Sequence, residues 1–177
     1  MNGQRINRSI IRSSFVEISR MYDSQKVLQK NVVFLICDNT LEAISLYCYH
    51  LVHKNIVFLI GREKGDRDII DLIDNFAPEE IFLCPGRFRH EEQVRELKSR
   101  NYRRVSGYHQ YTRYQRRYND VWSNLDDNTA LLITTSGSVG NGKVVALSYD
   151  NLRKNAEAII QSLEIDHHDM AGLLLPI

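Results

Sequence analysis

Three short apolar runs alternate with amphipathic stretches in the first half of the chain, and this alternation restricts the fold most strongly. The runs are Val32–Cys37, Ile56–Ile60 and Glu80–Cys84. The first run is continuously apolar and rich in β-branched residues, which is typical of strands buried on both faces of a parallel sheet. Between them, residues 39–52 and 66–76 show helical periodicity. Strand–helix–strand alternation predicts right-handed βαβ units, a mostly parallel sheet and the α/β fold class.

The helix expected after the first run begins near Asn39 and Thr40, two residue types that favour helix N-termini. A period of 3.6 residues per turn predicts one buried face. That face consists of Leu41, Ile44, Cys48, Leu51 and Val52.

Metal-ligating residue types occur at two places, but not in a ligand pattern. His50 and His53 are three residues apart and point away from the expected apolar face, so they cannot converge on one ion with Cys48. We expect both histidines to be exposed. The doublet His167-His168 is interpreted as an exposed turn, and no metal ligand is expected in the chain.

Composition narrows the class of protein. The 177 residues are 43% hydrophobic and 25% charged, which predicts one globular unit with its own core. A formal net charge of +1 argues against a protein built wholly for nucleic acid or anionic membranes. No apolar run approaches the ~20 residues of a membrane span, and no signal segment follows Met1, so we expect a cytoplasmic location without membrane contact. Cys37, Cys48 and Cys84 form no CxxC pair, which favours free thiols in a reducing compartment.

We interpret residues 1–177 as a single incomplete unit with four parts. Residues 1–30 are expected to form an N-terminal helix and connector, and residues 31–98 the βα units. A basic and aromatic connector is expected at 99–128. The last part, 129–177, is expected to hold a phosphate-loop hairpin and the helix after it.

The segment from Ser99 to Asn119 contains six arginines, five tyrosines and no acidic residue. Interleaved arginine and aromatic residues are typical of surfaces that bind single-stranded nucleic acid. The other interpretation is an edge strand and loop whose tyrosines pack with their hydroxyls in water. We favour the second, because the rest of the chain lacks a basic excess. A non-catalytic module that binds anions or single-stranded nucleic acid through residues 100–118 stays the alternative function.

Near the end of the sequence an apolar strand enters a loop rich in serine, threonine and glycine, and a second strand resumes after one lysine. Glycines let several backbone N–H groups converge on one anion, hydroxyls add donors, and the lysine supplies a positive charge. The pattern predicts a phosphate-binding loop. Its candidate nucleotide-binding residues are Thr134, Thr135, Ser136, Gly137, Ser138, Gly140, Asn141, Gly142 and Lys143.

Other types of site that use similar residues match this sequence less well. Residues 137–143 match Gly-x4-Gly-Lys, but Val144 stands where a Walker A motif needs Ser or Thr for magnesium, and a strand follows instead of a helix. Residues 37–40 lack the glycine turn of a dinucleotide fold. Ser136 stands where a nucleophile elbow around Ser138 needs glycine. A glycine-rich hairpin that binds no ligand is the remaining alternative, although such a turn needs fewer hydroxyls than this loop contains.

Residues Thr135 to Lys143, with Leu147 to Leu152 after them, resemble the signature of AMP-forming adenylating enzymes. That superfamily includes acyl- and aryl-CoA synthetases, luciferases and peptide-synthetase adenylation domains. Its usual pattern is Thr-Ser-Gly-Ser/Thr-Thr-Gly-x-Pro-Lys-Gly, then a strand, then Ser-His-x-Asn-Leu at a helix start. Its N-terminal domain also begins with βα units similar to residues 32–84, and residues 173–177 resemble its next motif. The resemblance implies the N-terminal part of the large domain of an adenylate-forming enzyme.

Three positions depart from the family pattern. Val139 replaces a threonine, Gly142 a proline and Val144 a glycine. One hydrogen bond to a charged group contributes about 1.5–3 kcal/mol, so Val139 implies weaker ATP binding or slower adenylation with the site retained. Gly142 is expected to loosen a loop that has to move.

The resemblance implies a reaction in which a carboxylic acid and ATP give acyl-AMP and pyrophosphate. The acyl group then passes to a thiol of CoA or of a carrier protein. The loop would hold the β- and γ-phosphates and Lys143 would offset their charge, while Mg²⁺ would bridge the phosphates through ligands outside this chain. The family places its catalytic residues later, so none is expected here. We expect an inactive N-terminal fragment whose unpaired edges and apolar surface cause self-association or marginal solubility.

Overall fold

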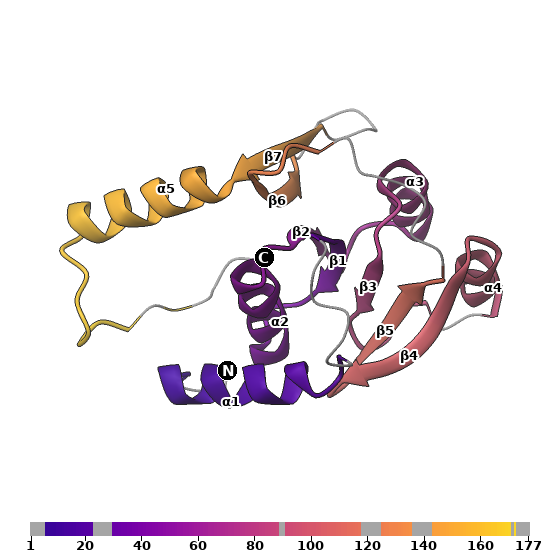
Figure 1. Cartoon of the computed structure of the whole chain (residues 1–177), viewed down its shortest axis with the longest axis horizontal. Helices are drawn as coiled ribbons and strands as arrows, with labels where there is room; N and C mark the ends of the chain where they lie inside the picture. The colour runs from indigo at the N-terminus through magenta and orange to yellow at the C-terminus, as the bar shows by residue number, and fades with distance from the viewer. Residues whose placement is uncertain are drawn as a thin grey trace.

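The computed structural model describes residues 6–22, 30–88, 91–117, 125–135, 143–170 and 172. Within these residues the chain forms one sheet and five helices (Figure 1). The strands are β1 (Val32–Cys37), β2 (Ile56–Gly61), β3 (Glu80–Leu83), β4 (Tyr102–Tyr108), β5 (Tyr111–Arg116), β6 (Thr129–Thr134) and β7 (Val144–Ser148). The helices are α1 (Arg8–Ser19), α2 (Leu41–Val52), α3 (Asp66–Phe76), α4 (Glu91–Ser99) and α5 (Tyr149–Ser162).

The sheet has the strand order β4-β5-β3-β1-β2-β6-β7. Its four central strands, β3, β1, β2 and β6, are parallel, while β5, β4 and β7 add antiparallel edges. The apolar runs of the sequence supply three of the central strands and β6 supplies the fourth, so the expected α/β class is confirmed. Because parallel strands end on the same side, the carboxyl ends of these four strands meet at one edge of the sheet.

Helices cover both faces of the sheet. Phe34 of β1 and Phe58 of β2 have ring centroids 5.0 Å apart, and Phe76 of α3 packs edge-on to Phe58 at 5.3 Å. Successive strand residues face opposite sides, so the neighbours of these phenylalanines face the other layer. There α2 lies against β1 and β2, and α1 packs on α2. This arrangement buries β1 and β3 completely and most of β2 and β6.

The buried face of α2 differs from the predicted one. The structure buries Ala43, Ser45, Leu46, Tyr49 and His50, whereas Val52 is 65% exposed. The helix is apolar on several sides and packs against both the sheet and α1, so a single stripe does not describe it. Phe15 of α1 meets Tyr49 edge-on at 5.6 Å, which shows the second contact.

Residues 99–128, expected to be a connector, contain the antiparallel strands β4 and β5. A Cβ atom at Gly107 would lie 1.9 Å from the Tyr111 carbonyl oxygen, so only glycine allows this close approach of the two strands. The hairpin extends the sheet on its β3 side, where β5 pairs with β3.

No helix in the described part of the chain is long and apolar enough to cross a membrane.

Candidate functional site

The expected phosphate loop connects β6 and β7 at the carboxyl edge of the parallel strands. Thr134 pairs with Val144 in the antiparallel register. One residue further, the Thr135 amide donates to the Lys143 carbonyl at 2.9 Å, and the Thr135 hydroxyl donates to the same oxygen at 3.3 Å. These bonds hold Thr135 and Lys143 together at the base of the loop.

The middle of the loop lies outside the described residues. The candidate phosphate contacts that fall there are Ser136, Gly137, Ser138, Gly140, Asn141 and Gly142, together with the substituted position Val139. The structure places the remaining candidates, Thr134, Thr135 and Lys143. These three residues lie at the two ends of the loop, so phosphate binding by the whole set stays a prediction.

The lysine is available for an anion. Lys143 is exposed, and its ammonium group has no hydrogen bond or ion pair within the described residues. Thr135 is exposed beside it, and Thr134 is half-buried. A lysine, hydroxyls and backbone amides form a donor set that suits phosphate oxygens, while it offers no carboxylate to a magnesium ion.

The ends of the neighbouring parallel strands are connected by a side chain next to the loop. Leu59 of β2 pairs with Ile133 of β6, so continuing this register puts Gly61 beside Thr135. The next residue, Arg62, binds the Asp38 carboxylate after β1 at 2.7 Å and the Pro85 carbonyl after β3 at 3.1 Å. One side chain therefore links the ends of three parallel strands next to the loop.

Two buried thiols lie below this edge. Cys37 ends β1, and Cys84 follows β3. Burial, followed by the nearby Cys84, raises the pKa of Cys37 to about 12, and burial also raises the pKa of Cys84. Both side chains are almost fully buried, which fits the expected free thiols and makes them poor nucleophiles.

The motif after β7 caps a helix. The Ser148 hydroxyl accepts from the Asn151 amide at 3.0 Å, and the Asn151 side chain accepts from the Ser148 amide at 3.0 Å. This reciprocal pair is a capping box at the start of α5. Tyr149 between them donates its hydroxyl to the Asn55 carbonyl at 2.8 Å and carries the Lys54 ammonium 4.3 Å from its ring centre. The Ser-Tyr-Asp-Asn sequence thus anchors α5 to the turn between α2 and β2.

The arginine and tyrosine segment offers little surface for stacked bases. Four of its tyrosines are at most 4% exposed: Tyr102, Tyr108, Tyr111 and Tyr114. The fifth, Tyr118, lies outside the described residues. Arg100 forms an ion pair with Asp74 at 2.6 Å, and Arg113 is buried. The structure therefore favours the edge-strand interpretation of this segment.

The structure contains a buried polar cluster near α1 that the sequence does not predict. The Arg113 guanidinium binds the Glu80 carboxylate at 2.7 Å, with both side chains 5% exposed. The Tyr22 hydroxyl donates to the same carboxylate at 2.7 Å, and burial raises the Tyr22 pKa well above its usual value. His50 lies 3.4 Å from the Tyr22 hydroxyl and 3.1 Å from the Asn55 amide nitrogen. In the sequence, the signal for this cluster is Glu80, a single acidic residue in an otherwise apolar strand.

His50 is therefore not the exposed residue that the sequence predicted. Its side chain is 1% exposed and packs against Tyr22, Tyr49 and Phe82. Burial, with the nearby Arg113 charge second, lowers its pKa to about 3. The ring is neutral, and we assign its proton to Nε2, because the Tyr22 hydroxyl already donates to Glu80 and the Asn55 amide donates to Nδ1.

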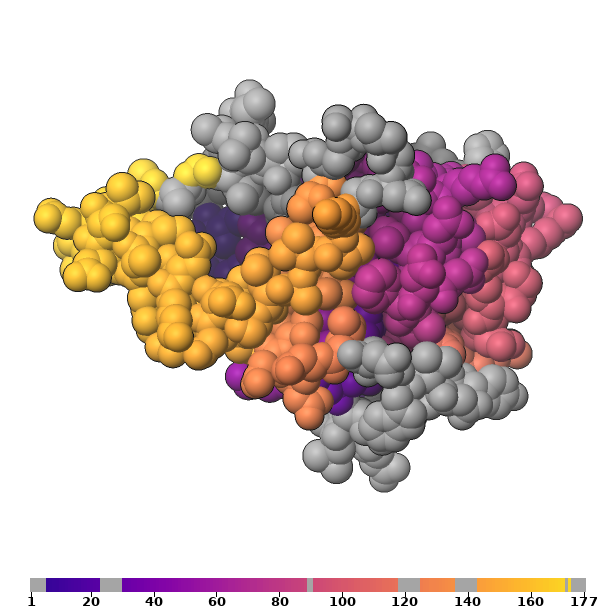
Figure 2. All heavy atoms as spheres, turned by 90° about the horizontal axis from the view of Figure 1, so that it is seen from above, coloured from indigo at the N-terminus to yellow at the C-terminus, as the bar shows by residue number. Residues whose placement is uncertain are grey.

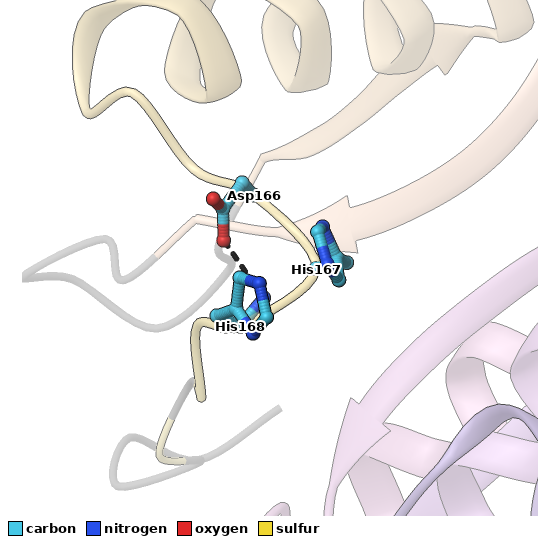
Figure 3. Close-up of side chains that lie close together, drawn as sticks. All are labelled: Asp166, His167 and His168. Atoms are coloured by element: carbon cyan, nitrogen blue, oxygen red, sulfur yellow. Dashed lines mark hydrogen bonds between the residues drawn. The ribbon is translucent and has the colours of Figure 1, made fainter.

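The described residues contain one group of at least three metal-ligating side chains with ligand atoms within 4.8 Å of one another. It consists of Asp166, His167 and His168 (Figure 3). All three are exposed, and the Asp166 carboxylate accepts from the His168 amide at 2.7 Å. The histidine doublet thus lies in an exposed turn, as the sequence predicted.

Comparison with solved structures identifies the fold. Apo MatB from Rhodopseudomonas palustris is similar over 98% of this chain and 36% of its own, with a TM-score of 0.69 and 16% identity. O-succinylbenzoate coenzyme A synthetase (MenE) from Bacillus subtilis, in complex with AMP, is similar over 99% of this chain and 45% of its own, with a TM-score of 0.68 and 14% identity. ATP-bound MatB is similar over 90% of this chain, with a TM-score of 0.62 and 16% identity.

The chain spans between a third and a half of the length of these proteins. At such low identity the likeness shows a shared fold. No protein-family model matches the chain, and no curated protein sequence matches it.

Proposed function

We propose that this chain forms the N-terminal, triphosphate-binding part of an ATP-dependent enzyme that adenylates a carboxylic acid. The observation that carries the proposal is the closed β6–β7 hairpin, which presents the exposed Thr135 and Lys143 at the carboxyl edge of a parallel sheet. Ligands of open α/β sheets bind at this edge. The similarity to structures solved with ATP and with AMP supports the same location for a nucleotide.

In this proposal the loop from Thr134 to Lys143 holds the β- and γ-phosphates. Thr134, Thr135, Ser136 and Ser138 supply hydroxyls, the glycines let backbone amides approach, and Lys143 carries the positive charge. As the bond between the α- and β-phosphates breaks, negative charge grows on the pyrophosphate, and a fixed lysine stabilises that charge. Mg²⁺ would neutralise the phosphates further, through ligands outside this chain.

The proposed reaction joins the substrate carboxylate oxygen to the α-phosphorus and breaks the α–β phosphate bond. The products are an acyl-adenylate and pyrophosphate. A thiol of CoA or of a carrier protein then attacks the acyl carbon and releases AMP. This chain supplies the pyrophosphate side of the site and no catalytic residue. The cytoplasmic location expected from the sequence stays a prediction.

The experiment that tests this activity is ATP–pyrophosphate exchange with a panel of aliphatic and aromatic acids. It is run on this chain and on a polypeptide that joins it to the C-terminal remainder of MenE. We expect exchange in the joined protein only, and a large loss on Lys143→Ala but not on Lys98→Ala in α4. Exchange that is unchanged by Lys143→Ala contradicts the role of the lysine.

A further inference from the structure

A carboxylate lies at the carboxyl edge of the sheet, beside the strand that leads into the loop. Glu63 follows the end of β2 in a tight turn, in which the Lys64 amide donates to the Gly61 carbonyl at 3.1 Å. The Glu63 side chain folds back over the strand end. A Cβ atom added at Gly61 would lie 2.7 Å from Oε2 of Glu63 and closer still to Oε1. The carboxylate therefore occupies the place where a side chain of residue 61 would stand.

The strand register shows what surrounds this carboxylate. Gly61 pairs with Cys37 of β1, and the register between β2 and β6, continued by two residues, puts Thr135 on its other side. Partners in neighbouring strands present their side chains on the same face, about 4.8 Å apart. The Glu63 carboxylate therefore lies between Cys37 and Thr135. The pKa of Cys37 agrees with this position, because burial raises it most and the Glu63 charge adds to the rise.

The same row of positions continues to the lysine of the loop. Thr134 pairs with Val144, so Thr135 stands opposite Lys143. An acid, a hydroxyl and a base thus follow one another on one face of this edge, in the order Glu63, Thr135, Lys143. Figure 2 shows the magenta segment around α3, which follows Glu63, beside the orange segment of β7, which follows Lys143.

Glu63 has no counter-ion within the described residues. Its carboxylate forms no hydrogen bond or ion pair there, whereas Asp38, at the neighbouring end of β1, is bound to Arg62. A carboxylate about one strand spacing from Thr135 repels a triphosphate held by that residue, because both groups are negative. A divalent cation between them removes the repulsion. Mg²⁺ suits this place, since it keeps several water molecules when it binds phosphates, and a carboxylate accepts hydrogen bonds from such water.

We propose that Glu63 faces the Mg²⁺ ion of the bound triphosphate and accepts hydrogen bonds from water on that ion, so that the loop selects the metal-complexed nucleotide over the free one. The inference rests on the proposed function, because it takes the triphosphate to lie at Thr135 and Lys143. The direct ligands of the ion are phosphate oxygens and groups outside this chain. Lys143 offsets phosphate charge at one end of the row, and Glu63 orients the hydrated cation at the other.

Isothermal titration calorimetry with ATP, once with excess Mg²⁺ and once with EDTA, tests the selectivity. The chain should bind MgATP more tightly than metal-free ATP. Glu63→Gln keeps the size of the side chain and removes its charge, so it should reduce this preference by about fivefold or more, mainly through tighter binding of metal-free ATP. The matched control is Glu92→Gln, an exposed carboxylate on α4, which should leave the preference unchanged.

Paramagnetic broadening of the ¹⁵N-labelled chain by MnATP locates the ion. The amides of residues 61–64 should broaden with MnATP and keep their line widths with MgATP. An unchanged preference in Glu63→Gln overturns the inference while ATP binding by the loop stands. Broadening at Thr135 and Lys143 that spares residues 61–64 has the same consequence. If ATP binds neither with Mg²⁺ nor with EDTA, the proposed function itself fails, and the inference fails with it.

Discussion

The amide of Thr135 donates a hydrogen bond to the carbonyl of Lys143 at 2.9 Å, at the base of the loop that joins β6 and β7. The backbone therefore fixes the separation between a lysine and a threonine that enclose a Ser/Gly-rich loop. Next to this pair, Arg62 ties the ends of β1, β2 and β3 together through Asp38 and Pro85. The loop thus starts and ends beside strand ends that one side chain connects, and it is carried by strands of the sheet, which is a favourable base for a phosphate-binding segment.

The buried ion pair between Arg113 and Glu80 gives the first prediction. Glu80→Ala leaves the guanidinium buried without its carboxylate, so the free energy of unfolding should fall by about 3–5 kcal/mol. Urea denaturation measures the change. The control is Glu91→Ala, which removes an exposed ion pair with Arg95 and should cost less than about 0.5 kcal/mol. Equal losses in the two variants would contradict the buried position of Arg113.

The buried His50 makes stability depend on pH. Its pKa is about 3 in the folded chain and near 6.5 when exposed, so between these values the unfolded state binds more protons. Its contribution is complete above pH 6.5 and is lost as the pH falls, by up to about 1.4 kcal/mol per pH unit. Denaturation at several pH values should show a shallower slope for His50→Gln. Identical slopes would place the imidazole in contact with water.

The pKa of Cys37, raised to about 12 by burial, predicts an unreactive thiol. Titration with a thiol reagent at pH 8 should modify Cys37 and Cys84 far more slowly in the native chain than in denaturant. The rate in denaturant serves as the control, and mass spectrometry identifies the modified residues. Rapid modification of Cys37 without denaturant would contradict its burial.

The sequence predicts the parallel centre of the sheet because each buried strand is a continuous apolar run, which needs no knowledge of distant partners. For the segment rich in arginine and tyrosine, the sequence favours an edge strand and loop, but it does not predict the paired strands β4 and β5. Arg113 can lie in the sheet only because Glu80, 33 residues earlier in the chain, neutralises it, and local sequence does not reveal that pairing. The burial of His50 was missed for the same reason, since Tyr22 and Asn55 satisfy its nitrogens.

For the candidate site too, the sequence predicts one part and does not reveal another. Loop composition predicts a phosphate-binding segment between two strands, and the structure provides those strands and the closing contact. The helix cap formed by Ser148 and Asn151 could not be told apart from a functional motif in the sequence alone. Its geometry assigns both side chains a structural role at the start of α5.

Position 139 yields a prediction that depends on the loop chemistry. Val139→Thr adds the hydroxyl that adenylating enzymes carry at this position, and a hydrogen bond to a phosphate contributes about 1.5–3 kcal/mol. The affinity for ATP should therefore rise by about tenfold or more, measured by isothermal titration calorimetry. Val145→Thr, in β7 beyond the loop, controls for the added hydroxyl. No gain at position 139 would mean that this side chain does not face the phosphates.

The central claim is that this loop binds a triphosphate, and a titration of the ¹⁵N-labelled chain with MgATP tests it most directly. Saturable shifts of the Thr134, Thr135 and Lys143 amides are expected, and inorganic tripolyphosphate should compete with ATP. Lys143→Ala should weaken binding by about tenfold or more, while Lys98→Ala on α4 should leave it unchanged. The absence of a saturable shift at these amides would contradict triphosphate binding by the loop, as would a Lys143→Ala variant that binds ATP as tightly as the unaltered chain.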